Sequence, residues 1–303
     1  MAMDLTLDSL ARSFSETGYV TTEDDQILIT VYLALKLGKP LLVTGAPGVG
    51  KTEIAKVLSK AFDAELIRLQ CYEGLDEHKA LYEWNYQRQL LRIQMMKDSE
   101  CLAEKDLFSP DYLLARPLLK AIQNSGPTVL LIDEIDKTDE EFEAFLFEVL
   151  SDFQVSIPEL GTVSAQQIPM VVLTSNGERE LSDGLKRRCI FLYVELPSVD
   201  KEYKIIRAKV PEAGEKLSRQ VAQAVSLLRS GLDLRKQPSI AETLDWIRAM
   251  MALEAERLTP ELIDKTLNLL LKNKEDRDGF EKNLGSEDLV DQVLQAEYKN
   301  AGR

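Results

Sequence analysis

Short apolar runs alternate with amphipathic segments through the first two thirds of the chain. The amphipathic segments at 21–36, 51–62 and 139–150 repeat apolar residues at helical spacing, and Thr21 or Thr22 lies near the start of the first. The apolar runs predict buried strands; they lie at 40–45, 64–71, 127–136, 168–176 and 190–197. Strands that alternate with helices predict an α/β fold whose mostly parallel sheet is flanked by helices.

The pattern changes after Pro197, where only helical periodicity follows. Ser239 and Glu242 fit a capping box at the start of a helix, and Pro260 fits the first helical position behind Thr259. We therefore expect two domains: an α/β core at 1–197 and a small all-α domain at 198–303.

Two segments of the core are less regular. Residues 74–124 look mostly helical, as a helical insert. Within them, "YEWNYQRQLLRIQMM" mixes aromatic and basic residues, which suits a nucleic-acid surface; the alternative is an amphipathic helix with Leu90, Leu91 and 93–96 near the core or a subunit contact. Residues 153–168 read as a hairpin around a Pro-Glu-Leu-Gly turn.

Composition narrows the function classes. The formal net charge of −14 disfavours binding to nucleic-acid backbones. Apolar runs fall short of the roughly 20 residues of a membrane span, so we expect no membrane association. Cys71, Cys101 and Cys189 form no CxxC pair, which favours a reducing cytoplasm over a disulfide framework. His78 is the chain's one histidine, so histidine-based metal clusters are not expected.

A glycine-rich loop follows the strand predicted at 40–45. The stretch "GAPGVGKT" fits G-x-x-x-x-G-K-[ST] and opens a predicted helix, the context that a phosphate-binding loop requires. Its backbone N–H groups are suited to binding phosphate. Lys51 is suited to binding the outer phosphates, and the Thr52 hydroxyl to binding Mg²⁺. The predicted nucleotide-binding residues here are Gly45, Ala46, Pro47, Gly48, Val49, Gly50, Lys51, Thr52 and Glu53.

Acidic residues follow the strand in "VLLIDEID". Asp133 suits a Mg²⁺ shell and Glu134 suits polarising an attacking water; Asp136 has no assigned role. The carboxyl edge of such a sheet is where ligands bind in open α/β folds. Read alone, the pair is as well explained by a solvated acidic strand end, but its partnership with the phosphate loop favours a catalytic pair.

Two further polar groups complete the candidate site. Asn176 ends the strand at 168–176, where its amide suits fixing the water beside Glu134, although a turn-forming asparagine before Gly177 is the common alternative. Arg187 and Arg188 precede the last strand. A guanidinium there suits offsetting phosphate charge across a subunit boundary, and a solvated basic turn explains at least one of the two.

Together, "GAPGVGKT", "LLIDEID", "LTSN" and "LKRRC" resemble an AAA+ ATPase in order and spacing, over residues 19–197. The resemblance implies ATP and Mg²⁺ as ligands, a lid formed by 198–303, and Arg188 as the arginine finger with Arg187 as runner-up. It also places Tyr19 and Val20 near adenine, in the linker "GYV". Where many relatives carry a lid arginine, this chain has Ile240, and Arg235 or Lys236 is the substitute.

The lead-in to the phosphate loop, the segment "YEGLDEHKALYEWNYQRQLLRIQ" and "KQPSIAETLDW" look like the MoxR family, CoxD-like branch. This resemblance implies a hexameric ring that acts as a remodelling chaperone with a von Willebrand A domain partner in maturing a client enzyme, for instance by metal-cofactor insertion. In such proteins the hairpin often faces the pore.

The alternatives are a nucleotide-gated binding module with incidental hydrolysis, a chelatase-like motor subunit, and a DNA-directed motor. Glu134 argues against a pure switch, because a switch has less need of a carboxylate that activates water. The net charge argues against the DNA motor.

Overall fold

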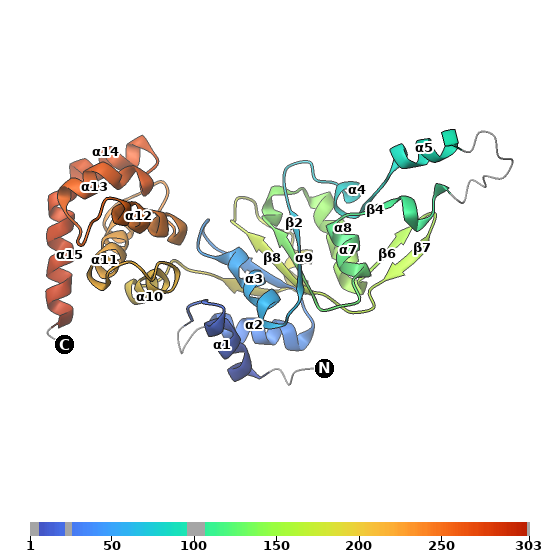
Figure 1. The fold of residues 1–303 in the computed structure, drawn as a ribbon, viewed down its shortest axis with the longest axis horizontal. Coiled ribbons are helices and arrows are strands. Elements are labelled where there is room, and N and C mark those ends of the chain that lie inside the picture. Colours follow the sequence, from blue (N-terminus) through green and yellow to red (C-terminus); the bar gives the residue numbers. More distant parts are fainter. Residues whose placement is uncertain (1–5, 22–25, 96–106, 302–303) are drawn as a thin grey trace. The chain divides into compact units, whose positions relative to one another are not determined.

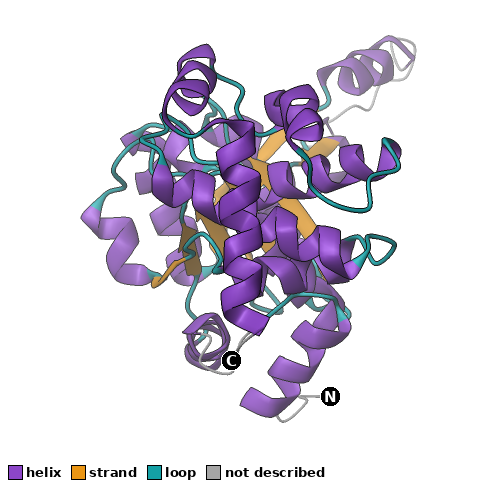
Figure 2. Ribbon diagram, turned by 90° about the vertical axis from the view of Figure 1, so that its left-hand side faces the viewer, coloured by secondary structure: helices purple, strands orange, loops and turns teal. Residues whose placement is uncertain are grey.

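The computed structural model describes residues 6–21, 26–95 and 107–301 (Figure 1). The described chain divides into two compact units. Of the described residues, 6–13, 26–45 and 51–193 belong to the first, whereas 194–301, with the short pieces 14–21 and 46–50, belong to the second. Thr22 and Cys101, which figured in the sequence predictions, lie outside the described residues. Helix predominates over strand throughout (Figure 2).

The first unit is built around a five-stranded sheet in which each neighbouring pair is parallel. The strand order is β2-β5-β8-β1-β9, so chain neighbours are separated by crossovers, as parallel pairing requires. The strands match the five predicted apolar runs; they are β1 (Leu41–Thr44), β2 (Glu65–Gln70), β5 (Thr128–Asp133), β8 (Met170–Ser175) and β9 (Ile190–Tyr193).

Both faces of this sheet are covered. Every residue of β5 is buried, and alternate side chains of a strand point to opposite faces. Leu130 and Ile132 share a buried cluster with Leu118 and Leu119 of α7 (Pro117–Gln123), whereas α3 (Lys51–Ala61) packs on the same strand outside that cluster. This unit also contains α2 (Gln26–Leu37), α8 (Glu140–Asp152) and α9 (Asp183–Arg188), and α1 (Leu7–Glu16) is divided between the two units. The predicted fold class is confirmed.

The segment predicted as a helical insert is not purely helical. Its helices are α4 (Glu77–Ala80) and α5 (Tyr86–Met95), but β3 (Tyr82–Trp84) and β4 (Leu113–Ala115) pair as an antiparallel ribbon. The 3-10 helix η1 (Pro110–Tyr112) leads into β4. Strands of three residues are too short for periodicity to reveal, which is why the sequence did not predict them.

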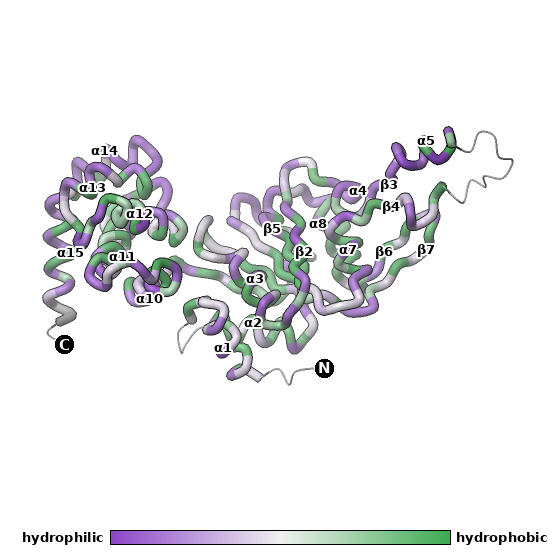
Figure 3. The backbone as a smooth tube through the Cα atoms, in the orientation of Figure 1, coloured by the Kyte–Doolittle hydropathy of each residue, from purple (hydrophilic) through white to green (hydrophobic). Residues whose placement is uncertain are grey.

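For helix α5 the sequence left open a nucleic-acid surface, packing near the core and a subunit contact. It is mainly hydrophilic with a short hydrophobic stretch (Figure 3), and Leu90, Leu91 and Met95 are exposed. Gln89 is buried instead, and its side chain donates a hydrogen bond to the carbonyl of Leu107. The apolar residues of this helix therefore do not pack in the core of the unit.

The predicted hairpin is confirmed. β6 (Gln154–Ile157) pairs antiparallel with β7 (Gly161–Ser164), and Gly161 has a positive φ of 84° at the end of the turn, a conformation that glycine adopts without strain.

The second unit consists of helices over its length from Val194: α10 (Val199–Lys209), α11 (Glu215–Gly231), α12 (Ile240–Ala252), α13 (Pro260–Thr266), the 3-10 helix η3 (Leu267–Leu269), α14 (Lys274–Asn283) and α15 (Gly285–Ala301). Ser239 and Glu242 form the predicted capping box of α12, and Pro260 opens α13 behind Thr259, which caps it. Trp246 and Phe280 are fully buried in its core. Among the described residues, no helix has the length and apolar character of a membrane span.

Candidate nucleotide site at the carboxyl edge of the sheet

The phosphate-loop residues lie where the sequence predicted them, between β1 and α3. Strand β1 ends at Thr44, and α3 begins at Lys51. Gly45, Gly48 and Gly50 have φ values of 149°, 76° and 95°, which turn the backbone in a way that β-carbon-bearing residues rarely allow. The loop's three glycines are thus explained by its backbone geometry.

Lys51 is buried at the start of α3 and links two strands. Its Nζ donates to the carbonyl of Gly45 at 2.7 Å and to Oδ1 of Asn176 at 2.8 Å. Burial lowers the pKa of Lys51, while the nearby carboxylates of Asp136 and Asp133 act in the opposite direction. The structure therefore brings the predicted lysine and the predicted asparagine into direct contact.

Thr52 and Asp133 meet as predicted for a shared magnesium shell. Thr52 Oγ1 donates to Asp133 Oδ1 at 3.1 Å, and Asp133 is 3% exposed. A hydroxyl and a carboxylate are hard oxygen ligands, and Mg²⁺ is commonly held by one or two protein oxygens together with waters and phosphate. These two residues fit that ion, and among the described residues no His/Cys/Asp/Glu cluster offers a dedicated metal cage.

Asp133 has a second hydroxyl partner that the sequence did not single out. Thr174 Oγ1 donates to Asp133 Oδ1 at 2.5 Å and accepts the backbone N–H of Glu134 at 2.9 Å. Thr174 lies on β8, the strand beside β5, so its hydroxyl fixes both the carboxylate of Asp133 and the backbone of the next residue.

Glu134 leaves the strand in a strained conformation. Its φ and ψ of 60° and 50° lie in the left-handed region, which is uncommon for a residue other than glycine and is often retained at functional sites. Its Oε2 accepts from Gln70 Nε2 at 3.0 Å and from Lys137 Nζ at 2.6 Å. The hydrogen bond to Glu134 raises the pKa of Lys137.

Asp136, which had no assigned role, holds the turn after β8. It lies in η2 (Ile135–Lys137), and its Oδ2 accepts the backbone N–H groups of Asn176 and Glu178 at 3.0 and 2.9 Å. Its buried Oδ1 has no hydrogen-bond partner within the described part of the chain. Asp136 therefore positions Asn176 while its charge lies near Lys51.

Arg188 lies on α9 and contacts α8. Its guanidinium stacks on the ring of Phe147 at 3.3 Å from the centroid and donates to the Phe147 carbonyl and to the Ser151 hydroxyl. Arg187 and Arg188 are both exposed. The structure does not bring either arginine into the cluster around Asp133, so a role on a neighbouring subunit's nucleotide remains a prediction.

The remaining predicted residues lie in the second unit. Tyr19 packs edge-on against Phe14 with 5.3 Å between ring centroids, and Val20 follows it. Lys236 Nζ lies 3.5 Å from Glu242 Oε1, and the backbone N–H of Arg235 donates to Asp276. Their roles at adenine or as a lid sensor remain predictions.

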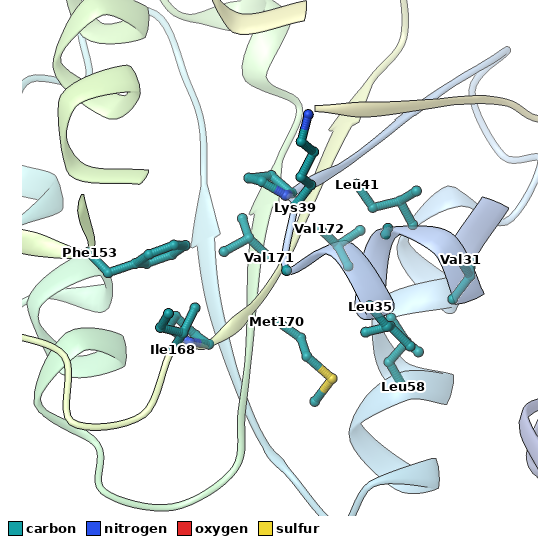
Figure 4. Close-up of a pocket in the computed structure, with 14 residues that line it drawn as sticks. Val31, Leu35, Lys39, Leu41, Leu58, Phe153, Ile168, Met170, Val171 and Val172 are labelled. Carbon is teal, nitrogen blue, oxygen red and sulfur yellow. The ribbon is translucent and has the colours of Figure 1, made fainter. Parts of the chain in front are cut away.

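An apolar pocket lies at the amino edge of the sheet, opposite the edge that carries Asp133 and Asn176. Its volume is about 190 Å³, and it is lined by α2, the starts of β1 and β8, Phe153 and Ile168 (Figure 4). The chemistry-bearing side chains follow the ends of β5 and β8 instead, so this pocket is not the candidate phosphate site.

Comparison with known proteins finds a match over the part of the chain that contains the phosphate loop and the acidic strand end. The family model described as "AAA domain (dynein-related subfamily)" matches residues 40–189, a stretch that contains the phosphate loop, both acids, Asn176 and Arg188. Residues 40–189 are therefore similar to an AAA domain.

Curated relatives are similar over different shares of their length. An uncharacterized protein of Staphylococcus aureus (strain USA300) is 26% identical over 72% of this chain and 77% of its own. The chaperone protein ClpB of Bacillus cereus is 28% identical over 47% of this chain, but the match spans 14% of ClpB. The gas vesicle ATPase GvpN1 of Halobacterium salinarum is 22% identical over 66% of this chain and 59% of GvpN1.

Solved structures with a similar fold include a variant of RuvB from Thermotoga maritima. It is 17% identical, with a TM-score of 0.49, over 90% of this chain and 73% of the other. A putative ATPase of Cytophaga hutchinsonii is 13% identical, with a TM-score of 0.47, over 95% and 94% of the two chains.

Proposed function

We propose that the AAA domain at residues 40–189 hydrolyses ATP and drives a remodelling chaperone of the MoxR type. The observation that carries this proposal is the joining of Lys51 to Asn176 and of Thr52 to Asp133, with Glu134 adjacent. These groups come from three distant parts of the sequence, and together they supply a phosphate ligand, a metal ligand pair and a candidate base.

Each side chain has one task in the proposed reaction. The loop N–H groups and Lys51 bind the phosphates, and Thr52 and Asp133 hold Mg²⁺, which neutralises charge on the phosphates. Glu134 polarises the attacking water and Asn176 orients it. Glu134 Oε2 accepts from Gln70 and Lys137, and a carboxylate offers about four acceptor sites on its two oxygens, so Glu134 can accept from water while it keeps these contacts.

The oligomeric part of the proposal concerns Arg188. It is exposed on α9 and oriented by Phe147 and Ser151, which suits a guanidinium that acts on the nucleotide of a neighbouring subunit. We therefore propose a hexameric ring in the cytoplasm. Its proposed partners are a von Willebrand A domain protein and a client enzyme that matures with its help, through metal-cofactor insertion among other routes.

The second candidate is a nucleotide-gated binding module. It uses the same loop and metal ligands, and it docks a partner without needing turnover. The hydrogen bonds of Glu134 to Gln70 and Lys137 favour this candidate, because they give this carboxylate a structural role that does not require turnover. Nucleotide binding with near-zero turnover that Glu134→Gln does not change is the result expected of such a module. A chelatase-like motor subunit shares the hydrolytic mechanism and differs in its client.

The experiment that tests the ring is the solution mass of Glu134→Gln, measured with and without Mg-ATP. This variant retains the phosphate and metal ligands, so we expect it to trap ATP and shift from small species to about six subunits. A species that stays small despite proven ATP binding would contradict a ring assembled by nucleotide alone. The matched control is Glu148→Gln, which neutralises an exposed glutamate on α8.

A further inference from the structure

Arg68 is a cation already in contact with the proposed magnesium ligand. It lies on β2, the edge strand beside β5. Its Nε and Nη2 lie 3.0 and 2.5 Å from Oδ2 of Asp133. The side chain of Arg68 is 54% exposed, whereas that of Asp133 is 5% exposed. Arg68 therefore lies between the buried carboxylate of Asp133 and the solvent.

The two oxygens of Asp133 are occupied differently. Oδ1 accepts from the hydroxyls of Thr52 and Thr174, while Oδ2 accepts from Arg68 alone among the hydrogen bonds of the described residues. Neutral hydroxyls can remain beside a bound cation, but a guanidinium repels it. The arginine is therefore the group that conflicts with magnesium at this carboxylate.

The position of Arg68 is fixed by its neighbour on the same face of β2. Residues two apart on a strand share a face, and Arg68 Nη2 donates to Oε1 of Gln70. Gln70 in turn donates to Glu134 at 3.0 Å. The arginine is thus held at Asp133 by two acceptors, Asp133 Oδ2 and Gln70 Oε1.

Stability alone gives little reason for this arrangement. Ion pairs with a half-exposed partner contribute little to folding, and Asp133 already has two hydroxyl donors that satisfy its buried oxygen. Lys51 lies near Asp133, Asp136 and Glu134 and partly balances their charge. Arg68 adds a second positive charge, placed directly on Oδ2 of Asp133.

We propose that Arg68 is a resident counter-cation of Asp133 that magnesium has to displace, so that Arg68 sets how strongly the metal promotes nucleotide binding. The inference rests on the proposed nucleotide site. Arg68 is a positioning residue in this scheme: it acts on the metal ligand and on the availability of Oδ2, not on the reacting phosphate.

The test is the affinity of the full chain for fluorescently labelled ADP, measured in excess Mg²⁺ and in EDTA. The quantity of interest is the ratio of the two dissociation constants. Arg68→Gln removes the competing charge, so we expect the promotion by magnesium to increase about three- to tenfold, the range between an exposed ion pair and a charged hydrogen bond. Thermal melting in EDTA checks that the variant is folded.

Two control variants separate competition from general effects. Arg68→Lys keeps a cation in place and should restore most of the wild-type ratio. Arg116→Gln removes a half-exposed arginine that pairs with Glu83, away from Asp133, and should leave the ratio unchanged. An Arg68→Gln ratio equal to or below that of the wild type overturns the inference, while magnesium-dependent ADP binding that requires Thr52 keeps the proposed function. Absence of ADP binding in the wild type overturns both.

Discussion

At the scale of single residues, Thr174 is the group that organises the acid pair. Its hydroxyl accepts the N–H of Glu134 and donates to Asp133, and Glu134 needs that support because its backbone lies in the left-handed region. A hydroxyl that serves as donor and acceptor at once cannot be replaced by a side chain of the same shape without a loss at both ends.

We expect Thr174→Val to lower the free energy of unfolding by about 1–3 kcal/mol, since it leaves a buried N–H and a buried carboxylate short of a partner. It should also reduce ATP turnover, because Glu134 loses its anchor. Denaturant unfolding and steady-state hydrolysis measure the two effects. Thr128→Val is the matched control on β5: it too is a buried strand threonine, bonded to the Gly126 carbonyl, and it should lose stability without a specific loss of turnover. Equal effects on turnover would count against the anchoring role.

The sequence predicted the site residues that lie within motifs. It did not predict the residues from other strands that contact those motifs. Lys51, Thr52, Asp133 and Glu134 each follow from a local pattern. Arg68 and Thr174 act on Asp133 because β2 and β8 flank β5, and strand order is a long-range property that local periodicity does not encode. The sequence did hold one signal for Arg68, the alternation of polar and apolar residues along β2. That alternation is equally typical of an edge strand with one face in solvent.

At the scale of elements, the helical unit depends on one buried ion pair. Arg229 of α11 donates to Glu202 of α10 through Nη1 and Nη2 at 2.6 and 3.0 Å, and Thr243 of α12 donates to the same carboxylate at 2.6 Å. Glu202 is fully buried, and burial raises its pKa against the effect of Arg229. Three helices therefore converge on one carboxylate.

Removal of the arginine leaves that carboxylate buried without its cation. We expect Arg229→Met to cost about 3–5 kcal/mol of unfolding free energy, measured by chemical denaturation of the full chain. Arg248→Met provides the comparison, because Arg248 forms an exposed pair with Asp245 and should cost at most about 1 kcal/mol. Similar losses in the two variants would show that the three-helix junction does not depend on the ion pair.

At the scale of the whole molecule, the account requires that one subunit complete the site of the next. Arg188 lies on α9, apart from the cluster around Asp133, and in the proposed ring it serves a neighbouring subunit. A heterologous interface of this kind closes into a ring, and it predicts that defects in two different parts of the site complement each other.

We expect Arg188→Ala and Lys51→Ala each to abolish most turnover when assayed alone. In an equal mixture, an Arg188→Ala subunit retains its phosphate loop and receives the arginine of a Lys51→Ala neighbour. Random assembly makes such pairs at about a quarter of the interfaces, so turnover should recover to that order. Mixing Arg187→Ala with Lys51→Ala is the control that separates the two arginines, and a mixture without recovery would argue against action across subunits.

The most direct test of the central claim is ATP turnover by Glu134→Gln compared with the wild type, with bound nucleotide measured on the same samples. The account predicts measurable hydrolysis by the wild type, a fall of at least about a hundredfold in the variant because its base is lost, and retention of bound ATP because Lys51, Thr52 and Asp133 remain. Wild-type protein that binds ATP without turnover, or a variant that hydrolyses at the wild-type rate, would contradict it.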